Sequence, residues 1–159
     1  MSNSITLRLV SQNLHKVKFQ IEKLELNDHL KDNWINFKPG SLASFKIAFF
    51  RITDSDNKQT YFILRNAFFI YENDSDDITI RYNDTLQPLY QKEEITPFLQ
   101  DKEQQLTKLV EEQKYLTALD DLNISTINKV KIQELEDQIW VLKAYTLFAL
   151  DPTEEAQWN

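Results

Sequence analysis

Apolar and polar residues alternate in several short runs within the first 90 positions. In the run SITLRLV, Ile5, Leu7 and Leu9 fall on one face, and Thr6 and Arg8 fall on the other. An alternation with a period of two residues is typical of a half-buried β-strand. Polar turns separate three later runs that are rich in aromatic and β-branched residues, which are FKIAFFRI (45–52), YFILRNAFFIYE (61–72) and ITIRY (78–82).

The alternation changes phase within the segment KVKFQIEKLEL. Val17, Phe19 and Ile21 share one face, but the next apolar residues, Leu24 and Leu26, fall on the other. A slip of one residue moves the apolar set to the opposite face unless a bulge or bend absorbs it. We therefore expect a bulge or bend at Glu22-Lys23.

The period becomes helical after Tyr90. Thr96 can cap a helix that begins at Pro97, since proline fits the first helical position. Apolar residues then form one stripe, made of Leu99, Leu106, Leu109, Val110 and Leu116. The segment DDLNIST (120–126) breaks the pattern and offers caps for a second helix, whose matching stripe is Ile132, Leu135, Ile139, Leu142 and Ala149. Asp151-Pro152 is a helix stop signal.

The second helix carries a further apolar flank that lies off this stripe. Its members are Trp140, Val141, Ala144, Leu147 and Phe148. A helix that is apolar on all sides must be covered on more than one side. The flank therefore either packs on the chain's own strands or binds a partner subunit, and the sequence leaves both interpretations open.

These patterns predict an α+β protein: an antiparallel β-sandwich followed by an antiparallel two-helix hairpin. We place the sandwich domain at residues 1–90 and the hairpin domain, with a short acidic tail, at residues 91–159. The charge changes at the same boundary. Residues 1–90 contain 11 Lys/Arg and 11 Asp/Glu and are neutral overall. Residues 91–159 contain 7 Lys/Arg and 14 Asp/Glu and supply the whole net charge of −7.

Composition and motifs exclude several kinds of function. Because neither half is basic, we do not expect a nucleic-acid partner. The chain contains no cysteine, no phosphate-binding glycine motif and no H-E-x-x-H motif, and its two histidines, His15 and His29, lie in different segments. We therefore expect a cytoplasmic non-enzyme without a cofactor or metal site.

The chain has a single glycine, Gly40, directly after Pro39. Such a glycine indicates a turn that requires a positive φ, a conformation that glycine alone adopts without steric cost. We therefore assign Pro39 and Gly40 to a structural turn.

The order of elements resembles the epsilon subunit of F-type ATP synthases over residues 4–150. IEKLEL (21–26) is similar to the family's V-E-x-I-x-V strand, and PGSLA (39–43) to its P-G-H-A-P turn. Arg65-Asn66-Ala67 stands at the family's Ser-Gly-Gly. The resemblance implies a non-catalytic central-stalk subunit that binds a gamma-like shaft, within an assembly of alpha- and beta-like subunits.

The resemblance places Tyr61 and Arg65 on a strand next to the gamma-like subunit. Three family features are not carried over. Ser41 replaces the histidine of the turn, so a contact with the membrane ring is not expected, and the hairpin has no arginine for an ATP site. The net charge of the hairpin also opposes an inhibitory contact with an acidic segment of the beta subunit.

A composition rich in Asn, Lys, Ile and Phe, together with the missing histidine, favours the divergent F1-like ATPases of mycoplasmas, some of which are associated with gliding motility. Such a subunit is expected at the inner face of the cell membrane. Two other functions remain open: a regulatory nucleotide-binding module and a free-standing adaptor protein.

Overall fold

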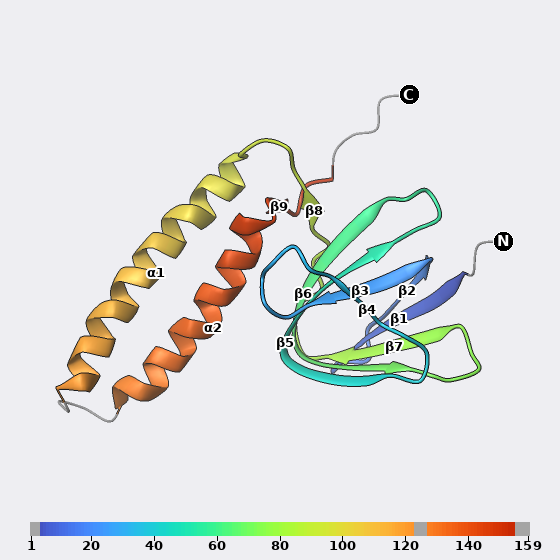
Figure 1. Ribbon diagram of the computed structural model, residues 1–159, viewed down its shortest axis with the longest axis horizontal. Coiled ribbons are helices and arrows are strands. Elements are labelled where there is room, and N and C mark those ends of the chain that lie inside the picture. Colours follow the sequence, from blue (N-terminus) through green and yellow to red (C-terminus); the bar gives the residue numbers. More distant parts are fainter. Residues whose placement is uncertain (1–3, 123–126, 155–159) are drawn as a thin grey trace. The chain divides into compact units, whose positions relative to one another are not determined.

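The computed structural model describes residues 4–122 and 127–154 of the chain (Figure 1). They form a mixed seven-stranded sheet, folded as a sandwich, and two helices that follow it in the sequence. The predicted α+β class and order of elements are confirmed. The chain divides into two compact units, one that extends to Tyr90 and includes the segment from Pro152, and one that comprises Gln91–Asp151.

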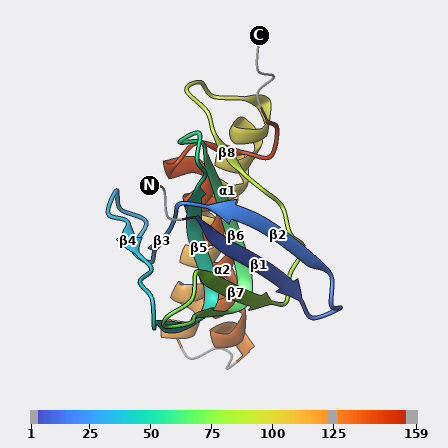
Figure 2. The same ribbon diagram turned by 90° about the vertical axis from the view of Figure 1, so that its right-hand side faces the viewer.

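The sheet has the strand order β2-β1-β7-β6-β5-β3-β4. The prediction of an antiparallel sandwich is wrong for one pair, because β1 and β7 pair in parallel, whereas the other neighbours pair antiparallel. The strands are β1 (Ile5–Ser11), β2 (Lys16–Ile21), β3 (Lys23–Asn27), β4 (Ile35–Asn36), β5 (Leu42–Thr53), β6 (Gln59–Tyr71) and β7 (Asp77–Tyr82). Figure 2 shows β2, β1 and β7 side by side.

The first fold in the sheet lies at Glu22, between β2 and β3. Ile21 pairs with Ile5 of β1, whereas Lys23 pairs with Thr53 of β5 at the other end of the strand order. The chain thus passes from one side of the sandwich to the other across a single residue. The phase change predicted at Glu22-Lys23 is confirmed as this break between strands.

The second fold lies within the long β5–β6 hairpin. The register pairs Phe45 with Ala67 and Ile47 with Arg65, and passes over Lys46 and Asn66 between them. Asn66 has φ +50°, a left-handed backbone conformation. In β6 the residues that face the core are Tyr71, Phe69 and Ala67 on one side of Asn66 and Leu64 and Phe62 on the other, so the alternation reverses there.

The two folds define two layers of the sandwich. The first layer consists of β2, β1 and β7 with residues 67–71 of β6 and 42–45 of β5. The second layer consists of β3 and β4 with residues 47–53 of β5 and 59–65 of β6. Their inner faces meet in one apolar core, in which Phe50 and Phe62 stack at 5.2 Å and Phe69 meets Phe50 edge to face at 5.2 Å.

Gly40 occupies the third position of a tight turn, as its sequence context predicts. The N–H of Ser41 donates to the carbonyl of Lys38, and Gly40 has φ +81°, the value that a type II turn requires after Pro39. The N–H of Gly40 donates to the carbonyl of Tyr71 at 2.8 Å, which ties the turn to β6. A Cβ at this position would meet Asn73 at 3.7 Å, an ordinary contact, so the backbone angle alone makes glycine necessary.

The helical unit begins at the predicted cap. α1 (Pro97–Asp121) follows Thr96, whose Oγ1 accepts from the N–H of Leu99 at 3.3 Å and donates to Asp151 Oδ2 at 2.6 Å. Asp151 is buried and belongs to β9 (Leu150–Asp151), which pairs with β8 (Tyr90–Gln91). One hydroxyl therefore caps the helix and joins the two ends of the unit.

α2 (Ile127–Leu147) packs along α1 as the predicted hairpin (Figure 1). Leu135, Ile139 and Leu142 of the predicted stripe are buried. Ala149 of that stripe does not belong to the helix, because α2 ends at Leu147 and Ala149 has φ +51°. The helix therefore stops before Asp151-Pro152, and the caps expected in 123–126 lie outside the described residues.

We predict that Gly40→Val destabilises the sandwich by more than about 1 kcal/mol, because a β-branched residue is strained at φ +81°. Urea denaturation measures the change. Gly40→Asn is the matched control and should lose less, since asparagine tolerates left-handed angles. Equal stability of the valine variant and the wild type would show that position 40 does not hold a positive φ in solution.

Candidate partner-binding surfaces

A cluster of aromatic and charged side chains covers the outer face of the second layer. It consists of Trp34, Phe49, Tyr61, Arg51 and Glu25 and is called the Trp34 cluster below. The Trp34 ring meets Phe49 at 5.1 Å and Tyr61 at 5.7 Å, both edge to face. The Arg51 guanidinium lies 4.2 Å from the centre of the Trp34 ring, within range of a cation–π interaction.

Arg51 is held by a forked contact with Glu25, its cross-strand partner in the register of β3 and β5. Nε donates to Glu25 Oε1 at 3.0 Å and Nη2 donates to Oε2 at 3.3 Å. Burial disfavours the charge of Arg51, but hydrogen bonds to Glu25 and Tyr61 outweigh it, and the pKa of Arg51 is raised above its usual value. The cluster therefore holds a permanently charged arginine in a largely buried setting.

Tyr61 and Arg65, the two partner residues expected on the sandwich, share the outer face of β6 but differ in exposure. Tyr61 is 2% exposed, and its backbone exchanges hydrogen bonds with Leu89 at 2.8 and 2.9 Å. Arg65 is exposed, and its N–H donates to Asp84 Oδ2 at 3.1 Å. Tyr61 thus supports the Trp34 cluster, while the Arg65 side chain is accessible to a partner.

The expected apolar flank of α2 contains both buried and exposed residues. Ala144 is buried, Trp140 and Val141 are half-buried, and Leu147 is 63% exposed. Phe148, predicted within the helix, follows its last residue and is buried. The carbonyl of Phe148 accepts from Gln91 Nε2 at 3.1 Å, which fixes the end of the helix against the segment that leads into α1. Leu147 is therefore the member of the flank that is most open to a partner.

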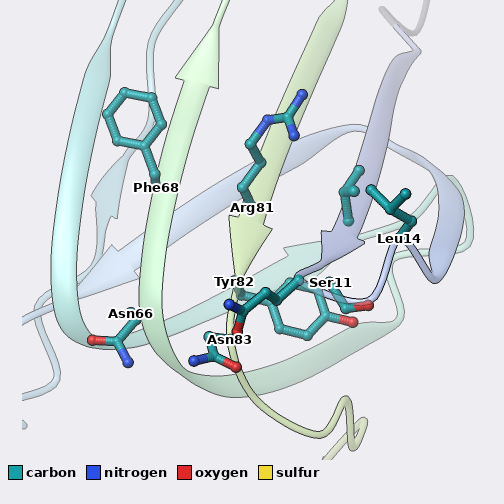
Figure 3. A pocket seen from close by; sticks show the side chains of 9 residues that line it. Ser11, Leu14, Asn66, Phe68, Arg81, Tyr82 and Asn83 are labelled. Atoms are coloured by element: carbon teal, nitrogen blue, oxygen red, sulfur yellow. The ribbon is translucent and has the colours of Figure 1, made fainter.

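A pocket of about 380 Å³ lies at one end of the first layer (Figure 3). Figure 3 shows Arg81 of β7 between Phe68 of β6 and Leu14, with Asn66 and Asn83 near its rim. Phe68 and Arg81 are direct cross-strand partners. The pocket is open and mixed in character, with amide, guanidinium and apolar groups.

The described residues contain no group of three His, Cys, Asp or Glu side chains that could hold a metal ion. Within the same residues, no helix is both long enough and apolar enough to span a membrane.

A family model described as the UU051 N-terminal domain matches residues 4–87. The chain belongs to this family. The matched segment contains all seven strands of the sandwich and ends before β8, so the Trp34 cluster and the pocket lie inside the UU051 N-terminal domain and both helices lie outside it. The family description states a position in the chain and no activity. No curated protein matches the chain.

Sequence reasoning missed the Trp34 cluster and the pocket. The cluster depends on the pairing of Glu25 with Arg51, which are 26 residues apart, and on Trp34 in a connecting segment. A tryptophan next to a short polar loop was the available signal. The pocket depends on the bend at Asn66, which no local pattern indicates.

We predict that Glu25→Gln lowers the free energy of unfolding by about 1–3 kcal/mol, because it weakens the charged hydrogen bonds of the largely buried Arg51. Asp77→Asn is the matched control. Asp77 pairs with Arg8 at 2.8 Å, but both side chains are over 40% exposed, so its loss should cost at most about 1 kcal/mol. Equal urea midpoints for the two variants would contradict a structural role for the Glu25–Arg51 pair.

A second prediction separates the exposed and buried members of the α2 flank. Leu147→Asp should leave the urea midpoint of the isolated chain near the wild-type value and weaken its assembly with the gamma-like subunit that the resemblance implies. Phe148→Asp should destabilise the isolated chain by several kcal/mol, since it buries an unpaired charge. Val130→Asp, at another exposed apolar position of α2, is the control and should change neither quantity. Unimpaired assembly of Leu147→Asp would show that the partner does not bind this flank.

Proposed function

We propose that this member of the UU051 N-terminal domain family is a non-catalytic central-stalk subunit of an F1-like rotary ATPase. It binds the gamma-like shaft, within an assembly of alpha- and beta-like subunits, and helps to couple ATP turnover to rotation. Torque transfer requires a rigid body with a large partner interface rather than a reaction centre of its own.

The observation that carries the proposal is the succession of a two-layer sandwich and an antiparallel helical hairpin in one chain. This order is the feature in which the sequence resembles the epsilon subunit. A fold alone does not determine a function, so two local features add weight.

Both local features are backbone angles at positions where the epsilon subunit has glycine. Gly40, in the turn after Pro39, has the positive φ that the P-G pair of the resemblance implies. Asn66, at the first glycine of the Ser-Gly-Gly stretch, has φ +50° although it is not a glycine. The backbone is thus left-handed at two of the three positions where the resemblance has glycine, and Ala67, at the third, has no positive φ.

The proposal does not include nucleotide binding or a contact with a membrane ring. Residues 91–159 contain no arginine for an ATP phosphate, and Ser41 stands in place of the turn histidine. We place the assembly in the cytoplasm, peripheral to the inner face of the cell membrane. The proposal extends to a divergent assembly that drives gliding motility in place of ATP synthesis.

Affinity purification of the full chain from its native cells tests the proposal. Gamma-, alpha- and beta-like chains should copurify in fixed proportion. In the purified complex, Arg65→Cys should crosslink to a cysteine engineered in the gamma-like subunit, because Arg65 is exposed and the native chain has no cysteine. Lys31→Cys, in the exposed loop between β3 and β4, is the control and should crosslink less.

Two results would contradict the proposal. The first is purification of the chain without any ATPase subunit, which favours a free-standing adaptor. The second is a clear rise in the melting temperature of the isolated chain with excess ATP, which favours a regulatory nucleotide-binding module.

A further inference from the structure

The outer face of the first layer gathers positive charge in a chain whose net charge is −7. The strand register aligns two rows across the face. The first row runs Lys16, Val10, Arg81, Phe68 and Ser44, and the second runs Lys18, Arg8, Thr79, Ile70 and Leu42. Lys46 follows Ser44 on the same face of β5, and the rows together with Lys46 are called the basic face below.

The basic face holds five cationic side chains and no carboxylate within its two rows. Asp77 lies beside the rows and pairs with Arg8 at 2.8 Å. Lys16, Lys18 and Arg81 make no ion pair with any residue that the structure describes. Strand alternation therefore separates charges that cancel in the overall count for residues 1–90.

Large apolar side chains are exposed among these cations. Phe68 is 39% exposed beside Arg81, and Leu42 is 68% exposed at the start of β5. Leu14, in the turn between β1 and β2, is 72% exposed and lines the pocket together with Phe68 and Arg81 (Figure 3). Exposed apolar side chains that surround a hollow are typical of a protein-binding surface.

Leu14 is held in a conformation that leucine disfavours. The β1–β2 and β5–β6 turns are closed in the same way: the N–H of Leu14 donates to the carbonyl of Ser11, and that of Asn57 to the carbonyl of Asp54. Leu14 has φ +62°, and Asn57, at the same position of the other turn, has φ +61°. Asparagine suits this angle and leucine does not, so the fold alone gives no reason for Leu14.

We propose that the basic face and Leu14 form the docking surface for an acidic, partly apolar segment of the gamma-like subunit. Cations at the edge would steer and orient the acidic segment, while Leu14 and Phe68 would bury apolar side chains around the pocket. The inference rests on the proposed function and adds a contact surface on the first layer of the sandwich to the one that Arg65 offers on the second.

A protein surface fits the basic face better than the other anionic partners. Phe68 is the one aromatic side chain in the two rows, whereas single-stranded nucleic acid is usually bound by several stacking rings. An anionic membrane would attract the same cations within a Debye length of about 8–10 Å, so binding of the wild type, but not of the basic-face variant, to anionic lipid vesicles would favour a membrane in place of a protein partner. An acidic segment makes short-range contacts and can match this face alone.

The test measures the affinity of the full chain for the purified gamma-like subunit at two salt concentrations. Lys18→Glu/Arg81→Glu should weaken binding by at least about 100-fold and reduce its salt dependence. The milder Lys18→Gln/Arg81→Gln should lie between this variant and the wild type. Lys108→Glu/Lys114→Glu, which makes the same charge change on exposed positions of α1, is the matched control and should bind within about threefold of the wild type.

Leu14→Asn provides a second readout that a merely structural role would not produce. It should raise the urea midpoint of the isolated chain, because it relieves the strain at φ +62°, and weaken binding by about tenfold, because it removes an exposed apolar contact. A variant that is more stable and also binds as tightly as the wild type would contradict the role of Leu14.

The outcomes separate the inference from the proposed function. If the wild type binds the gamma-like subunit and the basic-face variant binds equally well, the inference is wrong and the proposed function stands. Equal losses in the basic-face variant and the α1 control would also overturn the inference, because net charge would then explain both. If the wild type does not bind the gamma-like subunit, both fail.

Discussion

The left-handed backbone at Asn66 is the constraint on which the arrangement of the sandwich depends. The β5–β6 hairpin is too long to remain in one layer, and at Lys46 and Asn66 its side chains change faces. Without this change, the run that buries Ala67, Phe69 and Tyr71 would turn Phe62 and Leu64 toward the outside. The bend therefore lets both halves of one hairpin contribute to a single core.

The same bend determines what each outer face presents. In the second layer, the outward positions of the hairpin carry Phe49, Arg51 and Tyr61. These side chains pack with Trp34 and Glu25 into a largely buried cluster. In the first layer, the outward positions of the hairpin carry Phe68 and Ile70, which lie next to the cations of β7 and β1. One layer thus has a packed outer face and the other has an exposed basic face that suits an acidic partner.

Local patterns predicted the elements whose causes are local. The change of phase at Glu22, the cap at Thr96 and the turn at Gly40 each depend on a few adjacent residues, and the structure confirms all three. The bend at Asn66 was missed because AFFRI and AFFIY place apolar residues on both faces, which hides a reversal of alternation. The basic face was missed because strand pairing brings together residues up to 71 positions apart, whereas the sequence was judged by net charge.

Urea denaturation of Asn66→Gly and Asn66→Val tests this account of the sandwich most directly. Glycine accepts φ +50° freely, whereas valine is strained there by its branched side chain. The account predicts a glycine variant at least as stable as the wild type and a valine variant that is less stable by more than about 1 kcal/mol. A valine variant as stable as the glycine variant would show that the hairpin does not turn at Asn66, and the assignment of the outer faces would then be wrong.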